Sequence, residues 1–114
     1  MRVLITGSSG QIGTNLALKL MARGDQVVGI DLRPNPWTGQ IETQVANLLT
    51  MRDEDWPTGH FDVIVHLAAH AKVFELVEYP DRALDNVTDC FRALEFARRK
   101  RTPFIFGSSR EVYG

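Results

Sequence analysis

The sequence predicts an α/β fold organised around a doubly wound parallel sheet. Three observations support this: short apolar, β-branched runs recur along the chain, segments of helical periodicity separate several of them, and a glycine-rich turn follows the first run directly. Strands that alternate with helices pair in parallel through right-handed crossovers. One domain accounts for the 114 residues, because no internal repeat, low-complexity segment or linker interrupts the pattern.

The first half of the chain is expected to contain three strands and one helix. The run Arg2–Thr6 is typical of a buried parallel strand. A glycine-rich turn then opens a helix that stops at Arg23-Gly24, and a second strand, Gln26–Ile30, ends at Asp31. The remaining expectations are the helical spacing of Ile12, Leu16, Leu20 and Met21, a proline-containing loop over Arg33–Gln40, a weak strand Thr43–Ala46, and a helical turn within Met51–Trp56.

The second half is expected to contain two strands and one long helix. The apolar runs Asp62–His66 and Pro103–Phe106 predict the fourth and fifth strands. The segment from Pro80 to Arg99 has helical periodicity. We expect this helix to carry a set of apolar residues inward, namely Ala83, Val87, Phe91, Leu94 and Phe96.

Composition excludes several classes of function. The chain is 44% hydrophobic and 24% charged with a formal net charge of −1, so no global field attracts it to nucleic acid or membrane. No apolar run approaches the roughly 18 residues of a membrane span, and the N-terminus is not a signal peptide. The single cysteine, Cys90, fits a reducing compartment, so we expect a cytoplasmic protein. The basic run Arg98–Arg101 is expected to complement a helix dipole.

The glycine-rich turn has the features of a pyrophosphate site. Gly7, Gly10 and Gly13 follow a strand and open a helix, whose N-terminal N–H groups and dipole attract anions. Asp31 ends the next strand 18 residues after Gly13, close to the roughly 20 of the dinucleotide fingerprint. A carboxylate there binds ribose hydroxyls and repels a 2′-phosphate, so NAD is favoured over NADP, although Arg33 could reach such a phosphate. The glycine turn and Asp31 together predict a Rossmann-type fold. A P-loop is excluded, because no Lys-Ser/Thr pair follows the last glycine.

The G-x-x-G-x-x-G spacing and three later segments together resemble the extended short-chain dehydrogenase/reductase family, which contains NAD-dependent nucleotide-sugar epimerases and dehydratases. The three segments are Asn47-Leu48, His66–Ala71 and Gly107–Gly114. The resemblance covers the whole chain and implies a Rossmann-type sheet of strand order 3-2-1-4-5, ending after about five strands. It also implies NAD as the cofactor and a nucleotide sugar as the substrate.

The resemblance assigns cofactor contacts along the chain. Asn47 stands where the family has an aspartate beside the adenine, although it could be a simple loop residue. Asn86 matches an asparagine on the nicotinamide side, the alternative being a solvated helix position. His66 and His70 lie four apart, but that spacing joins metal ligands only on a helix, so we expect structural or pocket-lining roles and no metal. The expected cofactor-binding residues are Gly7, Gly10, Gln11, Ile12, Gly13, Asp31, Leu32, Asn47, Leu48, Leu67, Ala68, Ala69, Asn86 and Ser108.

The last segment carries the expected catalytic residues. Ser109 matches the hydroxyl residue that binds the reacting substrate oxygen, and Glu111 matches one of the two acids of the dehydratase branch. Arg110 stands where that branch has its aspartate, and arginine cannot release a proton at working pH, so an epimerase is favoured. The family's Tyr-x-x-x-Lys pair is absent: neither Tyr79 nor Tyr113 begins this motif.

The missing pair predicts that residues 1–114 are the N-terminal NAD-binding portion of a longer enzyme. On this view the C-terminal strands and the substrate domain are absent, and the chain alone is inactive. The alternative is a non-catalytic NAD(P)-binding module that senses or scaffolds. An uncovered fifth strand and apolar face would favour a homodimer or other self-association.

Overall fold

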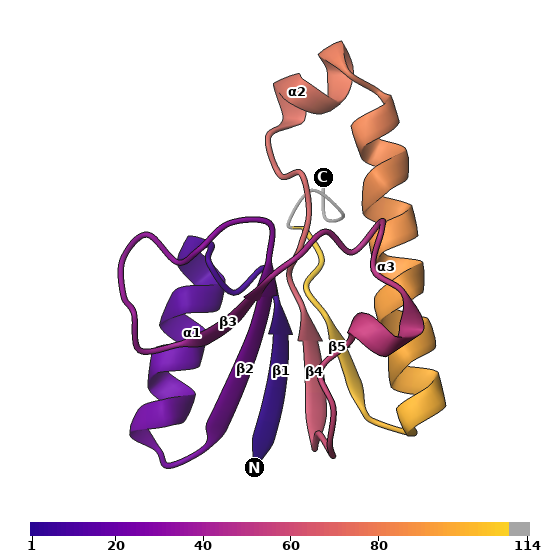
Figure 1. Ribbon diagram of the computed structural model, residues 1–114. Helices are drawn as coiled ribbons and strands as arrows, with labels where there is room; N and C mark the ends of the chain where they lie inside the picture. Colours follow the sequence, from indigo (N-terminus) through magenta and orange to yellow (C-terminus); the bar gives the residue numbers. More distant parts are fainter. Residues whose placement is uncertain (110–114) are drawn as a thin grey trace.

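A computed structural model describes residues 1–109 as a single sheet flanked by helices (Figure 1). The elements in chain order are β1 (Arg2–Thr6), α1 (Gln11–Ala22), β2 (Gln26–Asp31), β3 (Glu42–Val45), the 3-10 turn η1 (Asp53–Asp55), β4 (Val63–His66), α2 (Val73–Glu78), α3 (Asp81–Lys100) and β5 (Phe104–Phe106). All neighbouring strands pair in parallel in the order β3-β2-β1-β4-β5. The predicted fold class and strand order are therefore confirmed. The short helix α2 was not predicted.

Alternation along the strands divides the core into two layers. Leu4 in β1 is level with Val28 in β2 and Ile64 in β4, and all three belong to the cluster that contacts α3. Val3 and Ile5 point to the opposite face and join the cluster that contacts α1. Successive side chains of a strand face opposite sides, so α1 and α3 cover the two faces of one sheet (Figure 1). This arrangement is doubly wound.

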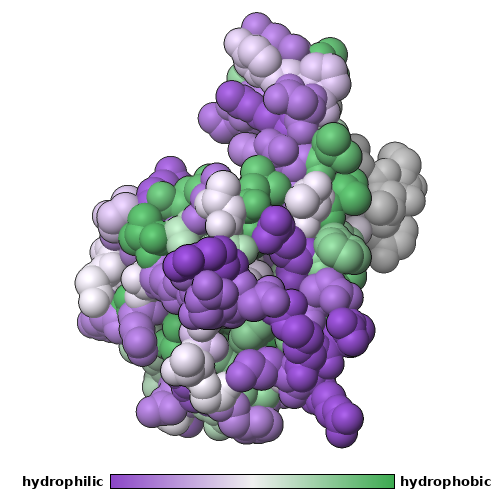
Figure 2. All heavy atoms as spheres, turned by 45° about the vertical axis from the view of Figure 1, so that its right-hand side comes forward, coloured by the Kyte–Doolittle hydropathy of each residue, from purple (hydrophilic) through white to green (hydrophobic). Residues whose placement is uncertain are grey.

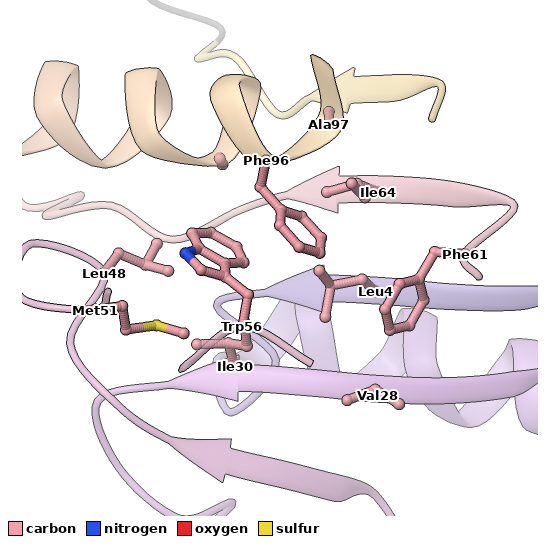
Figure 3. Packing of buried hydrophobic residues seen from close by; sticks show 11 residues of the cluster. Leu4, Val28, Ile30, Leu48, Met51, Trp56, Phe61, Ile64, Phe96 and Ala97 are labelled. Atoms are coloured by element: carbon pink, nitrogen blue, oxygen red, sulfur yellow. The ribbon is translucent and has the colours of Figure 1, made fainter. Parts of the chain in front are cut away.

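The layer beneath α3 contains the largest buried side chains. Trp56, which follows η1, stacks on Phe96 of α3 with ring centroids 4.5 Å apart and planes 14° from parallel (Figure 3). Phe61 and Leu4 continue this layer toward the amino ends of the strands. The segment between β3 and β4 therefore fills the space between the sheet and α3, where a crossover helix would otherwise lie.

The predicted inward face of the long helix is wrong for four of its five residues. Only Phe96 is buried, together with Ala93 and Ala97. The residues on the other predicted positions are exposed, namely Ala83, Val87, Phe91 and Leu94. The first turns of α3 extend with α2 beyond the carboxyl ends of the strands (Figure 1), so no strand lies beneath them. Hydrophobic residues consequently reach the molecular surface (Figure 2).

The basic run Arg98–Arg101 forms the C-terminal end of α3. Arg98 pairs with Glu95 at 2.9 Å, and Arg99 pairs with Asp53 of η1 at 3.1 Å. Arg101 ends the helix in the left-handed conformation. These cations lie where they complement the helix dipole, as predicted. Among residues 1–109, no helix combines the length and the apolar character needed to cross a membrane.

Candidate nucleotide-binding site

A pocket lies at the carboxyl ends of β1, β2 and β4, where the strand order reverses direction. Parallel α/β sheets bind ligands at such switch points. The structure brings together here nine of the residues predicted to contact a cofactor. They are Gly7, Gly10, Asp31, Leu32, Asn47, Leu48, Leu67, Ala68 and Ala69.

Two glycines let the first turn pack against its neighbours. Gly7 has a φ of +77°, and a Cβ there would lie 2.7 Å from the amide nitrogen of Ala68. A Cβ on Gly13 would overlap the carbonyl oxygen of Gly7 and lie 2.9 Å from the Cα of Ser8. Both obstacles are backbone atoms that cannot rotate away. Gly7 brings the turn next to the end of β4, and Gly13 brings α1 onto the turn.

Gly10 has a different role from Gly7 and Gly13. A Cβ at Gly10 would meet only the carbonyl oxygen of Gly7 within 4 Å, at an ordinary 3.4 Å. The fold therefore leaves room for a side chain, and glycine keeps the space before α1 open. Gly10 is also the N-cap of α1. Within residues 1–109, no side chain caps this end of the helix, and its first turn contains no acidic residue. The helix presents its N-terminal N–H groups to the pocket side, which favours an anion.

Asp31 joins the glycine turn to the end of β2. Its Oδ2 accepts a hydrogen bond from the amide of Ser9 at 3.0 Å, and its Oδ1 accepts one from the amide of Arg33 at 3.2 Å. The hydroxyl of Ser9 donates to the carbonyl of Arg33 at 2.8 Å. Each carboxylate oxygen retains capacity for a further donor. The arrangement fixes the Asp31 carboxylate at the pocket wall.

His66 holds the other side of the pocket in place. The amides of Leu67 and Ala68 donate to the hydroxyl oxygen of Thr6 at 3.2 and 3.3 Å, and this hydroxyl is hydrogen-bonded to Nδ1 of His66 at 2.7 Å. Burial lowers the pKa of His66, which favours the neutral imidazole. Its ring stacks with Phe104 and Phe106. His66 is structural, one of the two roles predicted for it.

Asn86 acts on the pocket through the backbone. The amide of His70 donates to Oδ1 of Asn86 at 2.7 Å, and Nδ2 of Asn86 donates to the carbonyl of His70 at 3.0 Å. This pair of bonds ties α3 to the loop after β4. The side chain of His70 lines the pocket, and its Nε2 lies 3.8 Å from Oδ2 of Asp85. Asn86 therefore positions the loop that carries Ala68 and Ala69.

Several predicted site residues lie outside the pocket lining. Ile12 is 72% exposed on α1, Gln11 beside it is also exposed, and Gly13 is buried in the turn. Ser108 and Ser109 are exposed after β5. Glu111 lies outside the described residues. The pocket also contains Ile30, Arg33, Ala46, His70 and Asp89.

Asp89 is the charged pocket residue that the sequence analysis did not consider. One signal was available, because Asp89 lies three residues after Asn86 and so shares its helix face. Within residues 1–109, no group of three or more histidine, cysteine or acidic side chains is placed to hold a metal ion.

Comparison with known proteins identifies the family. The model of the NAD dependent epimerase/dehydratase family matches residues 3–114. The chain belongs to this family. The match confirms the resemblance found in the glycine spacing and in the later segments.

Individual relatives include both reaction types named by the family. UDP-glucuronate 4-epimerase 1 of Arabidopsis thaliana is 31% identical, over 98% of this chain and 30% of its own length. The NAD-dependent NDP-hexosamine 5,6-dehydratase TunA, of tunicamycin biosynthesis, is 33% identical with a TM-score of 0.85, over 99% of this chain and 38% of its own. MoeE5, solved with UDP-glucose and NAD, is 29% identical with a TM-score of 0.84, over 100% of this chain and 38% of its own. The chain thus spans well under half the length of these relatives.

Proposed function

We propose that residues 1–114 form the N-terminal NAD-binding portion of a nucleotide-sugar epimerase or dehydratase. The observation that most supports this is that the glycine turn, the open N-terminus of α1 and the Asp31 carboxylate meet in one pocket. The family is NAD dependent, and the similar protein MoeE5 was solved with NAD. The C-terminal strands and the substrate domain of the whole enzyme lie, on this proposal, outside these residues.

The residues of the pocket fit the two ends of a dinucleotide. The backbone N–H groups at the start of α1 would bind the pyrophosphate in the space that Gly10 leaves open. Asp31 would accept hydrogen bonds from the hydroxyls of the adenosine ribose. Asn47 and Leu48 would flank the adenine, while Ala68 and Ala69 would leave room for the nicotinamide half. When bound, NAD supplies a hydride acceptor and donor for a sugar carbon.

Epimerisation is the favoured reaction of the whole enzyme. Ser109 would bind the reacting substrate oxygen, with Glu111 beside the substrate. Arg110 cannot serve as the second acid of water elimination at working pH. The sequence contains no Tyr-x-x-x-Lys, so we expect the chain alone to bind NAD and to leave UDP-sugars unchanged. Turnover of a UDP-sugar by the pure chain would contradict this expectation.

The cofactor proposal is tested by calorimetric titration of the chain with NAD and NADP. We expect NAD to bind more tightly than NADP. Asp31→Ala should weaken NAD binding at least tenfold and reduce the preference over NADP, because a charge-assisted hydrogen bond contributes roughly 1.5–3 kcal/mol. Asp53→Ala is the matched control, since Asp53 is an exposed aspartate of η1. If Asp31→Ala and Asp53→Ala bind NAD equally tightly, Asp31 does not contact the cofactor. If the chain binds neither NAD nor NADP, the proposal is refuted.

We further propose that the chain self-associates as a homodimer through α3. Leu84, Val87, Phe91 and Leu94 recur at intervals of three and four, and each is at least 45% exposed. Such a stripe matches the seam along which two helices pack, so a second copy of the same helix is its complement. Phe91→Glu should yield a monomer in light scattering, while Trp37→Glu, on the loop after β2, should not. A wild-type monomer at high micromolar concentration would contradict the proposal.

We also propose a cytoplasmic location. The single cysteine supports this, because disulfide frameworks mark oxidising compartments. Imaging of a fluorescent fusion of the full-length protein tests it.

A further inference from the structure

Asp89 occupies an unusual position for an acidic residue. It lies on α3 midway between two contacts that tie this helix to the rest of the molecule. Three residues before it, Asn86 holds the backbone of His70, and three residues after it, Arg92 donates to the carbonyl of Met51 at 3.0 Å. Residues three apart share a helix face, so Asp89 faces the space between these two contacts. Asp89 lines the nucleotide pocket, together with His70.

One carboxylate oxygen of Asp89 lacks a partner in the described protein. Oδ1 is buried and accepts no hydrogen bond from residues 1–109. Buried polar atoms are nearly always paired, because an unpaired one loses its hydration without compensation. A residue at the wall of a binding pocket can find its partner in the ligand. Because Oδ1 is shielded from water and unpaired, a negative charge on Asp89 is poorly stabilised, while the part of Asp89 that lines the pocket is the part that a bound molecule can reach.

The surroundings of Asp89 make protonation easier than for an ordinary exposed aspartate. Burial, and then the carboxylate of Asp85 one turn earlier on α3, raise the pKa of Asp89 to about 6, while His70 and Arg92 oppose the rise. From the other elements of the pocket, Asp31 adds a second negative charge and Arg33 a positive one. A pyrophosphate would bring further negative charge, which disfavours an ionised Asp89 still more.

We propose that Asp89 is a nucleotide-contacting residue that binds in its protonated form and donates its carboxyl proton to a hydrogen bond with the bound dinucleotide. This inference rests on the proposed NAD-binding function. The proton comes from solvent, so each binding event at neutral pH takes up one proton. A protonated carboxyl is both a donor and an acceptor, whereas the ionised form is an acceptor that also repels phosphate. Asp89 thereby makes the affinity of the pocket depend on pH.

The test is titration of the chain with NAD by calorimetry between pH 5 and pH 8. In wild type the dissociation constant should be constant below pH 6 and should rise by up to roughly tenfold per pH unit above it, the limit for uptake of one proton. Repeating the titration at pH 7.5 in buffers of different ionisation enthalpy measures this proton uptake directly. Asp89→Asn retains a donor without a charge, so its NAD affinity should vary little with pH and exceed the wild-type affinity at pH 8.

His70 is the control, because it is a second ionisable side chain that lines the same pocket. His70→Gln should leave the pH dependence in place. If His70→Gln abolishes the dependence and Asp89→Asn does not, the proton belongs to His70 and the inference about Asp89 is wrong. Wild-type binding without proton uptake overturns the inference and leaves the NAD proposal intact. Absence of NAD binding at every pH, with folding verified by circular dichroism, overturns both.

Discussion

Replacement of Gly13 by alanine tests whether the turn depends on direct backbone packing. A Cβ at this position overlaps the carbonyl oxygen of Gly7 and lies 2.9 Å from the Cα of Ser8. Overpacking of this kind costs about 1–3 kcal/mol, and rigid backbone neighbours place Gly13→Ala at the upper end. Alanine returns up to about 1 kcal/mol of helix propensity at a helical position. The expected net loss is about 2 kcal/mol of unfolding free energy, or roughly 8 °C in Tm for a domain of this size.

The measurement is thermal unfolding by circular dichroism, followed by titration with NAD. Gly39→Ala is the matched control, since a Cβ at Gly39 has no neighbour within 4 Å and its backbone is not left-handed. We expect Gly39→Ala to have an unchanged or slightly raised Tm. We expect Gly13→Ala also to weaken NAD binding, because the turn must move. A Tm of Gly13→Ala equal to or above that of Gly39→Ala would refute the packing argument.

Three other substitutions examine the supports of the pocket. Phe96→Ala removes the ring stacked on Trp56 and should lower the unfolding free energy by about 3–5 kcal/mol in urea denaturation; a loss below about 1 kcal/mol would contradict its place in the core. Asn86→Ala leaves the amide and carbonyl of His70 without their partner and should cost about 1–3 kcal/mol, whereas Asn15→Ala, on the exposed face of α1, should cost far less. Because the pKa of His66 is lowered in the folded state, the unfolded chain binds a proton at a higher pH than the folded chain does. As pH falls below about 6.5, this difference favours unfolding, so His66 destabilises the fold in acid. His66→Gln should reduce that acid sensitivity, and an unchanged pH profile would show that His66 is not the titrating group.

The sheet and the glycine turn were predictable because their signals are local. β1, β2 and β4 are short apolar runs. A parallel strand that is buried on both faces consists almost entirely of apolar residues, so such a run predicts the strand directly. The site residues lie at the carboxyl ends of these strands: Gly7 and Gly10 lie in the turn after β1, and Asp31 is the last residue of β2. Their proximity depends only on parallel pairing, which places the carboxyl ends of all strands at one edge of the sheet.

The orientation of α3 was not predictable from apolar spacing alone. One stripe of this helix carries Val87 and Phe91, and the opposite stripe carries Asn86, Asp89 and Phe96. Hydrophobic periodicity selects the first stripe, but the second faces the molecule. Asn86 is turned inward by two backbone bonds and Phe96 by its stack on Trp56. Hydrogen bonds to a loop backbone leave no periodic mark in the sequence, so the inward stripe could be located only from Asn86, whose helix face Asp89 shares three residues later.

In the proposed site, Asp31 combines two tasks that cannot be altered separately. Its oxygens already accept from the amides of Ser9 and Arg33, which leaves one further acceptor position on each oxygen. Two acceptors match the two neighbouring hydroxyls of a ribose. Asn at this position would turn an NH₂ group toward one of the two amides, so one N–H would lose its acceptor whichever way the amide is turned. Exchange of cofactor preference by Asp31→Asn should therefore also loosen the glycine turn, and a variant that accepts NADP without losing stability would need a new acceptor for Ser9 or Arg33.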